Sequence, residues 1–426
     1  MHQSAAVLFQ SYLDVRCFTE KLCEPLQTED YVVQSMPDVS PTKWHIAHTS
    51  WFFETFLLKA NLPHYQSPHP QYDFLFNSYY NSVGDRHCRA HRGLISRPTV
   101  EETFRYRAFV DAQMGELLHS ANEEQLQKLA PILTLGLHHE QQHQELLLTD
   151  IKHVFSVNPL LPAYRDRTST QADLVPSQHW VSFDEGISEV GHMGDNFCFD
   201  NEEPRHREFL ESFALSSRLV TNGEYLEFMQ DGGYERPEFW LSAGWSTVQQ
   251  NQWQAPFYWE KRGTDWQMFT LSGLHEISLD EPVCHVSLFE ADAYARWAGA
   301  RLPGEAEWEV AAANALQSGN RITGNFADNG VLHPVPLQSN SDDSTMAQMF
   351  GDVWEWTRSQ YVPYPGYAPA AGALGEYNGK FMCNQFVLRG GSCATSASHI
   401  RHTYRNFFPP DARWQFSGIR LAKDLR

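Results

Sequence analysis

Three histidines crowd into six positions of the stretch LHHEQQHQELLL, residues 137–148, directly before a run of leucines. On a helix, His139 and His143 lie about one turn apart on the same face, whereas His138 points elsewhere. Two imidazoles with this spacing can bind one metal ion, as they do in the H-E-x-x-H motif. A polar helix face that carries histidines for other reasons is the alternative, so the choice depends on further ligands.

A second pair, His45 and His48 in the stretch WHIAHTSWFFE, has the i,i+3 spacing that also shares a helix face. Either residue could supply a third imidazole, because metal sites in helical bundles are built from facing helices. Spacing alone does not choose between them, and both could instead hydrogen-bond within an aromatic core. Three histidines leave coordination positions open, which is typical of a catalytic site, and imidazole suits zinc, iron, copper and nickel alike.

Helical periodicity dominates the chain up to about residue 160. The stretch VEETFRYRAFVDAQMGELLHSA predicts a helix capped by Thr99, with Glu102 in the capping-box position. The stretch SPTKWHIAHTSWFFETFLLKA predicts another helix, with Ser40 as its cap and Pro41 at the first helical position. The histidine-rich stretch falls in one or two further helices around Pro131. Together these segments predict a helical bundle.

The fold class that we expect is α+β, in two domains. The bundle spans residues 1–160, a linker rich in Pro, Ser and Thr spans 161–175, and a second domain spans 176–426. In that second domain short β-like pieces alternate with glycine turns and tryptophans, as in HWVSFDEGISEVGHMG and FVLRGGSCAT. The stretch SLFEADAYARWAGA predicts a helix among them.

The composition excludes several classes of partner. The 426 residues carry a formal net charge of −20, which disfavours phosphate backbones and anionic lipid. No apolar run approaches the roughly 18–20 residues of a membrane span, and the N-terminal stretch lacks the blocks of a signal peptide. The seven scattered cysteines form no C-x-x-C pair and indicate a reducing compartment. We therefore expect a cytoplasmic protein with no nucleic acid and no membrane partner.

Seven blocks of the sequence, in order and through nearly the whole chain, resemble the ergothioneine-biosynthesis sulfoxide synthases (EgtB type). They are SPTKWHIAHTSWFFE, FLFNSYYNSVGDRH, RGLISRPT, LGLHHEQQHQELLLTDIKH, GDVWEWTRS, VLRGGSCAT and YRNFFPPDARWQFSGIRLA. The resemblance implies an N-terminal DinB-like four-helix bundle. It also implies a second domain like the formylglycine-generating enzyme, with a C-type-lectin-like fold.

The resemblance further implies a metal, a reaction and substrates. In the family three histidines bind one non-haem Fe²⁺, and the matching residues here are His48, His139 and His143. His45 and His138 are then neighbours of the ligands or packing residues. The implied reaction uses O₂ to join a thiol donor, cysteine or γ-glutamylcysteine, to C2 of the imidazole of N-α-trimethylhistidine (hercynine) as a sulfoxide. Zinc has no redox chemistry and could not support this reaction.

Carried over residue by residue, the resemblance assigns roles to three more side chains of the bundle. Gln142 matches a glutamine that hydrogen-bonds the substrate imidazole. Tyr79 and Tyr80 match loop tyrosines that, in one branch of the family, reach the iron site as proton donors. The structural alternatives are an exposed helix residue for Gln142 and ordinary aromatic packing for the two tyrosines.

Two further groups match substrate-binding blocks. The block that surrounds the trimethylammonium group, where aromatic faces suit a quaternary cation, comprises Asn406, Phe407 and Phe408. Some relatives carry Trp-Asp where this chain has two phenylalanines, and that departure points to the branch with the loop tyrosines. The block that binds the donor's carboxylates comprises Arg86, Arg89 and Arg92. A solvated basic loop is its structural alternative.

Other activities stay open at this point. Close relatives join selenium from a selenosugar to hercynine to give selenoneine, and ovothiol relatives attack C5 of histidine. A DinB-like zinc-dependent thiol transferase or hydrolase, and a non-catalytic binding protein with a structural metal, belong to other classes. Formylglycine-generating enzymes hold copper with two cysteines shortly after a GGS sequence. Only Cys393 lies in that region here, so we do not expect that activity.

Overall fold

The computed structural model describes residues 4–167, 175–316, 322–338, 346–370 and 372–425. The chain forms two compact units, the first comprising Met1–Tyr164 and Ala370–Tyr377, the second comprising Arg165–Pro369 and Asn378–Arg426. Residues 168–174, seven of the 15 residues of the expected linker, lie outside the described residues. The segment Ala370–Tyr377 packs with the helical unit, although the sequence analysis places it in the second domain.

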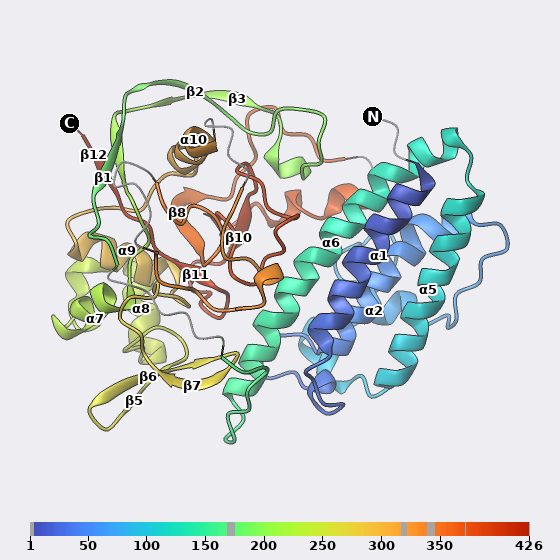
Figure 1. Cartoon of the computed structure of the whole chain (residues 1–426), viewed down its shortest axis with the longest axis horizontal. Coiled ribbons are helices and arrows are strands. Elements are labelled where there is room, and N and C mark those ends of the chain that lie inside the picture. The colour runs from blue at the N-terminus through green and yellow to red at the C-terminus, as the bar shows by residue number, and fades with distance from the viewer. Residues whose placement is uncertain (1–3, 168–174, 317–321, 339–345, 371, 426) are drawn as a thin grey trace. The chain divides into compact units, whose positions relative to one another are not determined.

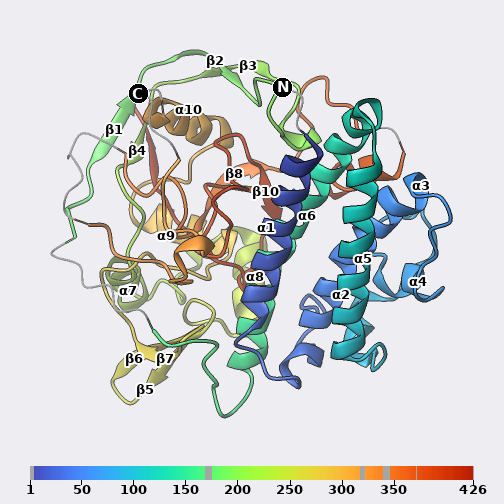
Figure 2. The same ribbon diagram turned by 45° about the vertical axis from the view of Figure 1, so that its right-hand side comes forward.

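Four long helices build the first unit and lie side by side in Figures 1 and 2. They are α1 (Ala5–Cys23), α2 (Thr42–Phe53), α5 (Val100–Ser120) and α6 (Glu123–Ser156). Both α1 and α2 contact α5 and α6, which is the arrangement of a four-helix bundle. The shorter elements are a π-helical turn (Glu54–Leu58), α3 (Lys59–Asn61), α4 (Tyr72–Phe76) and 3₁₀ turns at Asp30–Val32 and Arg89–Leu94.

Local sequence sets where the two longest helices begin. Thr99 Oγ1 accepts from the backbone N–H of Glu102, and the Glu102 carboxylate accepts from the backbone N–H of Thr99, so the expected capping box is confirmed. Asn122 and Gln125 form the same reciprocal pair at the start of α6. α6 is one continuous helix that includes Pro131, and its length tolerates the loss of the one backbone donor that proline lacks.

The expected cap of α2 is wrong. The helix begins at Thr42, Pro41 precedes it, and no side chain caps it. Ser40 Oγ instead accepts a hydrogen bond from Arg92 Nη1 at 2.9 Å, and Ser40 N–H donates to Asp150 Oδ2 at 2.8 Å. A buried guanidinium is a stronger donor than a neutral helix amide, so the serine hydroxyl serves the arginine rather than the helix.

Every residue of α2 is buried, although the helix carries lysine and two histidines. Its aromatic side chains, among them Trp51 and Phe53, form the bundle core with residues from α1, α5 and α6. Gly136 lets α6 approach α2 closely, because a Cβ at that position would lie 2.6 Å from a ring carbon of Phe53. This close approach brings the histidines of the two helices within reach of each other.

The described part of the second unit combines small sheets with helices, so the expected α+β class is confirmed. One sheet has the antiparallel order β1 (Trp180–Phe183), β4 (Phe213–Ser216), β12 (Ala422–Asp424). The largest has the order β10 (Asn406–Phe408), β9 (Phe386–Arg389), β8 (Trp354–Gln360), β11 (Ser417–Gly418), with β11 parallel to β8. The expected C-type-lectin-like topology stays a prediction.

Further strands and four α-helices belong to the described part of the second unit. The strands are β2 (Gly186–Val190), β3 (His206–Leu210), β5 (Trp259–Arg262), β6 (Asp265–Thr270) and β7 (Gly273–Glu276). The helices are α7 (Asn222–Gln230), α8 (Ser242–Asn251), α9 (Leu288–Trp297) and α10 (Glu305–Leu316). Within the described ranges, none of the helices combines the length and apolar composition that crossing a membrane requires.

Candidate metal centre

Three buried histidines of the bundle converge on one point. His48 comes from α2, and His139 and His143 come from successive turns of α6. One ring nitrogen of each lies within 4.8 Å of one ring nitrogen of the other two, and Nε2 of His48 lies 3.2 Å from Nε2 of His139. The helix spacing therefore produces the shared face that the sequence predicted, and α2 supplies the third imidazole.

The electrostatics keep these imidazoles neutral. Burial lowers the pKa of His139 to about 4 and holds the pKa values of His48 and His143 well below the ordinary histidine value. The neighbouring imidazoles, and the positive charge of Arg92 for His48 and His143, act in the same direction. A neutral imidazole offers a lone pair, so at neutral pH each ring is ready to bind a cation.

Hydrogen bonds orient two of the three rings. His48 Nδ1 lies 2.6 Å from the backbone oxygen of Phe76, which requires a proton on Nδ1 and leaves the lone pair on Nε2. His143 Nδ1 lies 2.8 Å from Nδ1 of His45, which leaves its Nε2 for another partner. Among the described residues, buried Nδ1 of His139 has no hydrogen-bond partner. Convergent neutral imidazoles fit a divalent transition metal with open coordination positions.

Glu140, the acid of the H-E-x-x-H pattern, is not available to a metal-bound water. Its carboxylate is fully buried and accepts hydrogen bonds from Arg16 at 3.0 Å, from Thr19 at 2.7 Å and from Arg107 at 2.7 Å. The two guanidinium groups hold the pKa of Glu140 down at about 2 against the opposing effect of burial. A general base needs a pKa near the working pH, so Glu140 anchors α6 to α1 and α5 instead.

A residue that the sequence analysis missed, Tyr377, lies beside the centre. Its hydroxyl donates to Gln142 Oε1 at 3.1 Å, and its ring centroid lies 6.2 Å from that of His139. Burial raises the pKa of the Tyr377 phenol. The residue reaches this place because Ala370–Tyr377 packs with the bundle, a contact 235 positions away in sequence that no local pattern in ALGEYNG announces.

The two loop tyrosines occupy different environments. Tyr80 is buried in the bundle core, with its ring against Trp51 and Phe56. Tyr79 is half-buried, its hydroxyl accepts from Arg89 Nη1 at 3.2 Å, and its ring contacts that of Tyr377 at 6.4 Å. The two residues thus differ in their contacts: the ring of Tyr79 meets that of Tyr377, whereas Tyr80 packs in the core, where burial, with Tyr377 nearby, raises the pKa of its phenol.

Residues 370–377 also fix this tyrosine loop through Glu376. Its carboxylate accepts from the backbone N–H of Asn81 at 2.8 Å and from that of Ser82 at 2.9 Å. Both amides directly follow the tyrosines in sequence. Because one carboxylate holds two successive amides, the loop conformation depends on a segment from the far end of the chain.

The three arginines of the basic stretch separate into two kinds. Arg86 and Arg89 are exposed, and each donates to oxygens of nearby loops. Arg92 is buried, its Nη atoms donate to hydroxyls of Ser40 and Ser78, and its guanidinium lies 3.3 Å from the ring centroid of Trp44. Burial lowers the pKa of Arg92 to about 9, which still leaves it charged at neutral pH.

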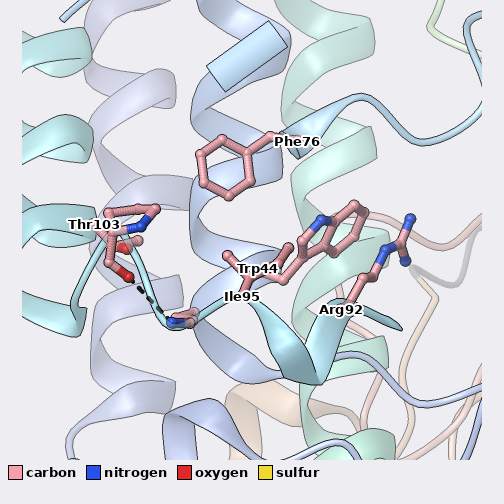
Figure 3. Close-up of a pocket in the computed structure, with 7 residues that line it drawn as sticks. Trp44, Phe76, Arg92, Ile95 and Thr103 are labelled. Atoms are coloured by element: carbon pink, nitrogen blue, oxygen red, sulfur yellow. Dashed lines mark hydrogen bonds between the residues drawn. The ribbon is translucent and has the colours of Figure 1, made fainter. Parts of the chain in front are cut away.

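Arg92 is therefore part of the wall of the centre. Figure 3 shows its side chain beside the indole of Trp44, in a pocket that Phe76 also lines. The indole of Trp44 also stacks on the ring of His48, with centroids 4.6 Å apart and planes 13° from parallel. A guanidinium, an indole and a candidate metal ligand are thus in successive contact.

The expected trimethylammonium block belongs to the second unit. Asn406, Phe407 and Phe408 form strand β10, which pairs antiparallel with β9. Phe407 stacks on Tyr361 with centroids 4.1 Å apart, and Phe408 meets Trp414 edge to face. This strand is an aromatic surface of its unit, and its part in binding a substrate stays a prediction.

Comparisons with known proteins agree with the two units. Residues 14–147 match the DinB superfamily, and residues 166–425 match the sulfatase-modifying factor enzyme 1-like domain. The chain is 32% identical over 415 residues to a hercynine oxygenase of Mycolicibacterium smegmatis, covering 92% of this chain and 93% of that one. It is also 32% identical over 440 residues to a hercynine oxygenase of Mycolicibacterium thermoresistibile, covering 99% and 95%.

A more distant relative shares only part of its length. The ergothioneine biosynthesis protein 1 of Schizosaccharomyces pombe is 29% identical over 239 residues, which is 54% of this chain and 28% of that protein. With two full-length relatives of one name and both domain types in the same order, the chain belongs to the hercynine oxygenase family of oxygen-dependent oxidoreductases, the ergothioneine-biosynthesis sulfoxide synthases that its motifs resemble.

Proposed function

We propose that this protein is a non-haem iron(II) enzyme that uses O₂ to join the sulfur of a thiol donor to C2 of the imidazole of hercynine. The donor is cysteine or γ-glutamylcysteine, and the product is a sulfoxide on the route to ergothioneine. The observation that carries the proposal is the convergence of His48, His139 and His143, all buried and neutral, in a chain of the hercynine oxygenase family.

The donor set and the reaction class together favour iron. Three imidazoles accept zinc, copper and nickel as well as iron, so the ligands alone do not name the metal. An oxygenase needs a redox-active metal, and zinc has no redox chemistry. Fe²⁺ held by these three histidines would supply O₂ reduction and a positive charge that keeps a nearby thiol substrate as thiolate.

The remaining side chains of the centre bind and orient the substrates. Gln142 offers its amide to the imidazole of hercynine, and Tyr377 holds that amide in place through a hydrogen bond of 3.1 Å. Arg89 and Arg86, the two exposed arginines, pair with the carboxylates of the donor. Buried Arg92 contributes positive charge from behind Trp44 rather than a direct contact to the donor.

Tyr79 supplies the proton that favours the sulfoxide over oxidation of the donor alone. Its hydroxyl accepts from Arg89, so its own O–H is directed elsewhere, and its ring contacts Tyr377 beside the centre. Coupling of sulfur to the imidazole needs one oxygen atom to leave as water, and a positioned phenol can give it a proton. In the second unit, Asn406, Phe407 and Phe408 offer aromatic faces to the trimethylammonium group.

A zinc hydrolase is the alternative that the H-E-x-x-H pattern suggests, and one observation disfavours it. The glutamate that would act as base is locked between two guanidinium groups at a pKa of about 2. No such observation distinguishes cysteine from γ-glutamylcysteine as the donor. Nor does one favour C2 coupling of sulfur over selenium transfer or over attack at C5 of histidine.

Product analysis tests the proposal and separates these reactions. Apoprotein is loaded anaerobically with Fe²⁺ and given hercynine, then O₂ with cysteine, γ-glutamylcysteine or a selenosugar in turn. A sulfoxide at C2 from one of the two thiols supports the proposal. Coupling only with the selenosugar, or only at C5, replaces it with the corresponding alternative. Zn²⁺-loaded protein is the control and should give no coupled product.

A further inference from the structure

A line of buried polar contacts leads away from one of the candidate ligands. His143 Nδ1 lies 2.8 Å from His45 Nδ1, and His45 Nε2 lies 3.0 Å from Asp150 Oδ2. All three side chains are buried, so none of these contacts exchanges with bulk water. The pair of histidines joins α6 to α2, and Asp150 returns the line to α6 almost two turns further along.

Counting protons along this line gives an assignment that satisfies every contact. A carboxylate oxygen accepts, so His45 donates from Nε2, and a neutral imidazole that donates from Nε2 keeps its lone pair on Nδ1. His143 must then carry a proton on Nδ1 to donate to that lone pair. The lone pair of His143 is left on Nε2, the nitrogen that is free to face His48 and His139. The carboxylate therefore determines, through one intervening ring, which nitrogen of His143 can bind a metal.

We propose that His45 and Asp150 are positioning residues that fix the tautomer and ring orientation of His143 as a metal ligand. The proposal rests on the metal site of the proposed function, and it adds the residues that preorganise it. A carboxylate that orients a metal-binding histidine directly is a common arrangement, and here a second histidine extends it. His45, which spacing left indistinguishable from His48, thus acts behind the ligands rather than as one of them.

The contacts of Asp150 indicate that its carboxylate serves as a hydrogen-bond acceptor for His45. Its Oδ2 accepts from His45 and from the backbone N–H of Ser40, while its buried Oδ1 has no hydrogen-bond partner among the described residues. A buried carboxylate is costly unless its oxygens are well satisfied, so general stability does not explain this one. The charge is placed where His45 needs an acceptor.

Ser40 connects Asp150 to the residues that pack against His48. Its hydroxyl accepts from Arg92 at 2.9 Å, and Arg92 lies against Trp44, which stacks on His48. The three ligands consequently have different supports. His48 has a backbone oxygen, His143 has the line through His45 to Asp150, and His139 has no hydrogen-bond partner on Nδ1 among the described residues.

Matched substitutions separate the polar line from simple packing. His45→Phe keeps a ring in the core and removes both nitrogens, whereas His45→Gln loses the ring and keeps an acceptor and a donor. Asp150→Leu removes the acceptor, whereas Asp150→Asn retains one oxygen for His45. His153→Phe is the packing control, because His153 is also buried on α6, where its Nδ1 bonds the hydroxyl of Ser35.

The measurement is the Kd of each purified apoprotein for Co²⁺, followed by the visible absorption of the bound ion, with circular dichroism to verify folding. We expect one Co²⁺ per wild-type chain and binding about 10–100-fold weaker in His45→Phe and in Asp150→Leu. His45→Gln, Asp150→Asn and His153→Phe should stay close to wild type. In addition, proton NMR of the Co²⁺ protein should show a slowly exchanging, strongly shifted His143 ring N–H that His45→Phe removes.

Two kinds of failure are distinguishable. Wild-type affinity in both His45→Phe and Asp150→Leu overturns the positioning role while leaving the metal site intact. An equal loss in His153→Phe assigns the effect to bundle packing and also overturns it. If wild-type protein binds no stoichiometric Co²⁺, or if His143→Ala binds it as tightly, the metal site itself is refuted and the positioning role with it.

Discussion

Replacing Glu140 with glutamine should destabilise the bundle strongly and spare the chemistry of the metal centre. The carboxylate is fully buried and is held by Arg16, Arg107 and Thr19. The difference between an ordinary glutamate pKa of 4.5 and the pKa of about 2 corresponds to about 3 kcal/mol of unfolding free energy at neutral pH. Breaking a buried ion pair by removing one partner costs about 3–5 kcal/mol, which agrees with that value.

The assay is urea denaturation of apoprotein at pH 7, followed by tryptophan fluorescence. Glu124→Gln is the matched control, because that carboxylate lies on the same helix in an exposed pair with Lys128 and should cost less than about 1 kcal/mol. The folded pKa of Glu140 lies below its unfolded pKa, so its contribution is complete above pH 4.5 and is lost as the pH falls toward 2. The gap between wild type and Glu140→Gln should narrow over that range.

Two results would refute this reasoning about Glu140. A change of less than about 1 kcal/mol would mean that the cluster does not stabilise the charge. Full stability combined with complete loss of activity would mean that the glutamate acts as a general base, as it does in zinc enzymes with the same pattern. Our account predicts reduced stability together with Fe²⁺ binding by the folded fraction.

Three further predictions concern His139, Arg89 and the loop tyrosines. Because the folded pKa of His139 is about 4 and its unfolded value is 6.5, the unfolded chain takes up the proton first, and the apoprotein should lose about 3 kcal/mol between pH 6.5 and 4. His139→Leu should lose less over the same range in urea titrations. Arg89→Ala should raise the KM of the thiol donor roughly thirtyfold, about 2 kcal/mol, and leave that of hercynine nearly unchanged; equal effects on both count against it. Tyr79→Phe should keep iron and O₂ uptake but shift the product, measured by mass spectrometry, from sulfoxide toward the donor's sulfinic acid, whereas Tyr80→Phe should keep the wild-type ratio.

Local patterns predicted what depends on local geometry. The i,i+4 spacing of His139 and His143 places both on one face of any helix, and the structure brings them together. The capping box at Thr99 is equally local, because its two hydrogen bonds join residues three positions apart. Sequence spacing could not predict whether His45 or His48 faces His139 and His143, because that depends on how α2 is rotated about its axis against α6.

Contacts between distant segments could not be predicted in this way. Ser40 fails as a cap because Arg92, 52 positions away, takes its hydroxyl. The sequence does not distinguish Arg92 from Arg86 and Arg89. Only the fold places its guanidinium against the ring of Trp44. Tyr377 reaches Gln142 because residues 370–377 pack on the bundle, and nothing in the composition of that short segment marks it for this place.

The central claim is that His48, His139 and His143 hold an iron that couples sulfur to hercynine with O₂. The most direct test follows O₂ uptake and product in one vessel, with anaerobically prepared protein carrying one Fe²⁺ per chain, hercynine and either thiol. We predict one sulfoxide formed at C2 for each O₂ consumed, and neither iron binding nor product when any one of the three histidines is alanine. Full iron occupancy in His143→Ala, or fully loaded wild-type protein that consumes O₂ without coupling either thiol, would contradict the account.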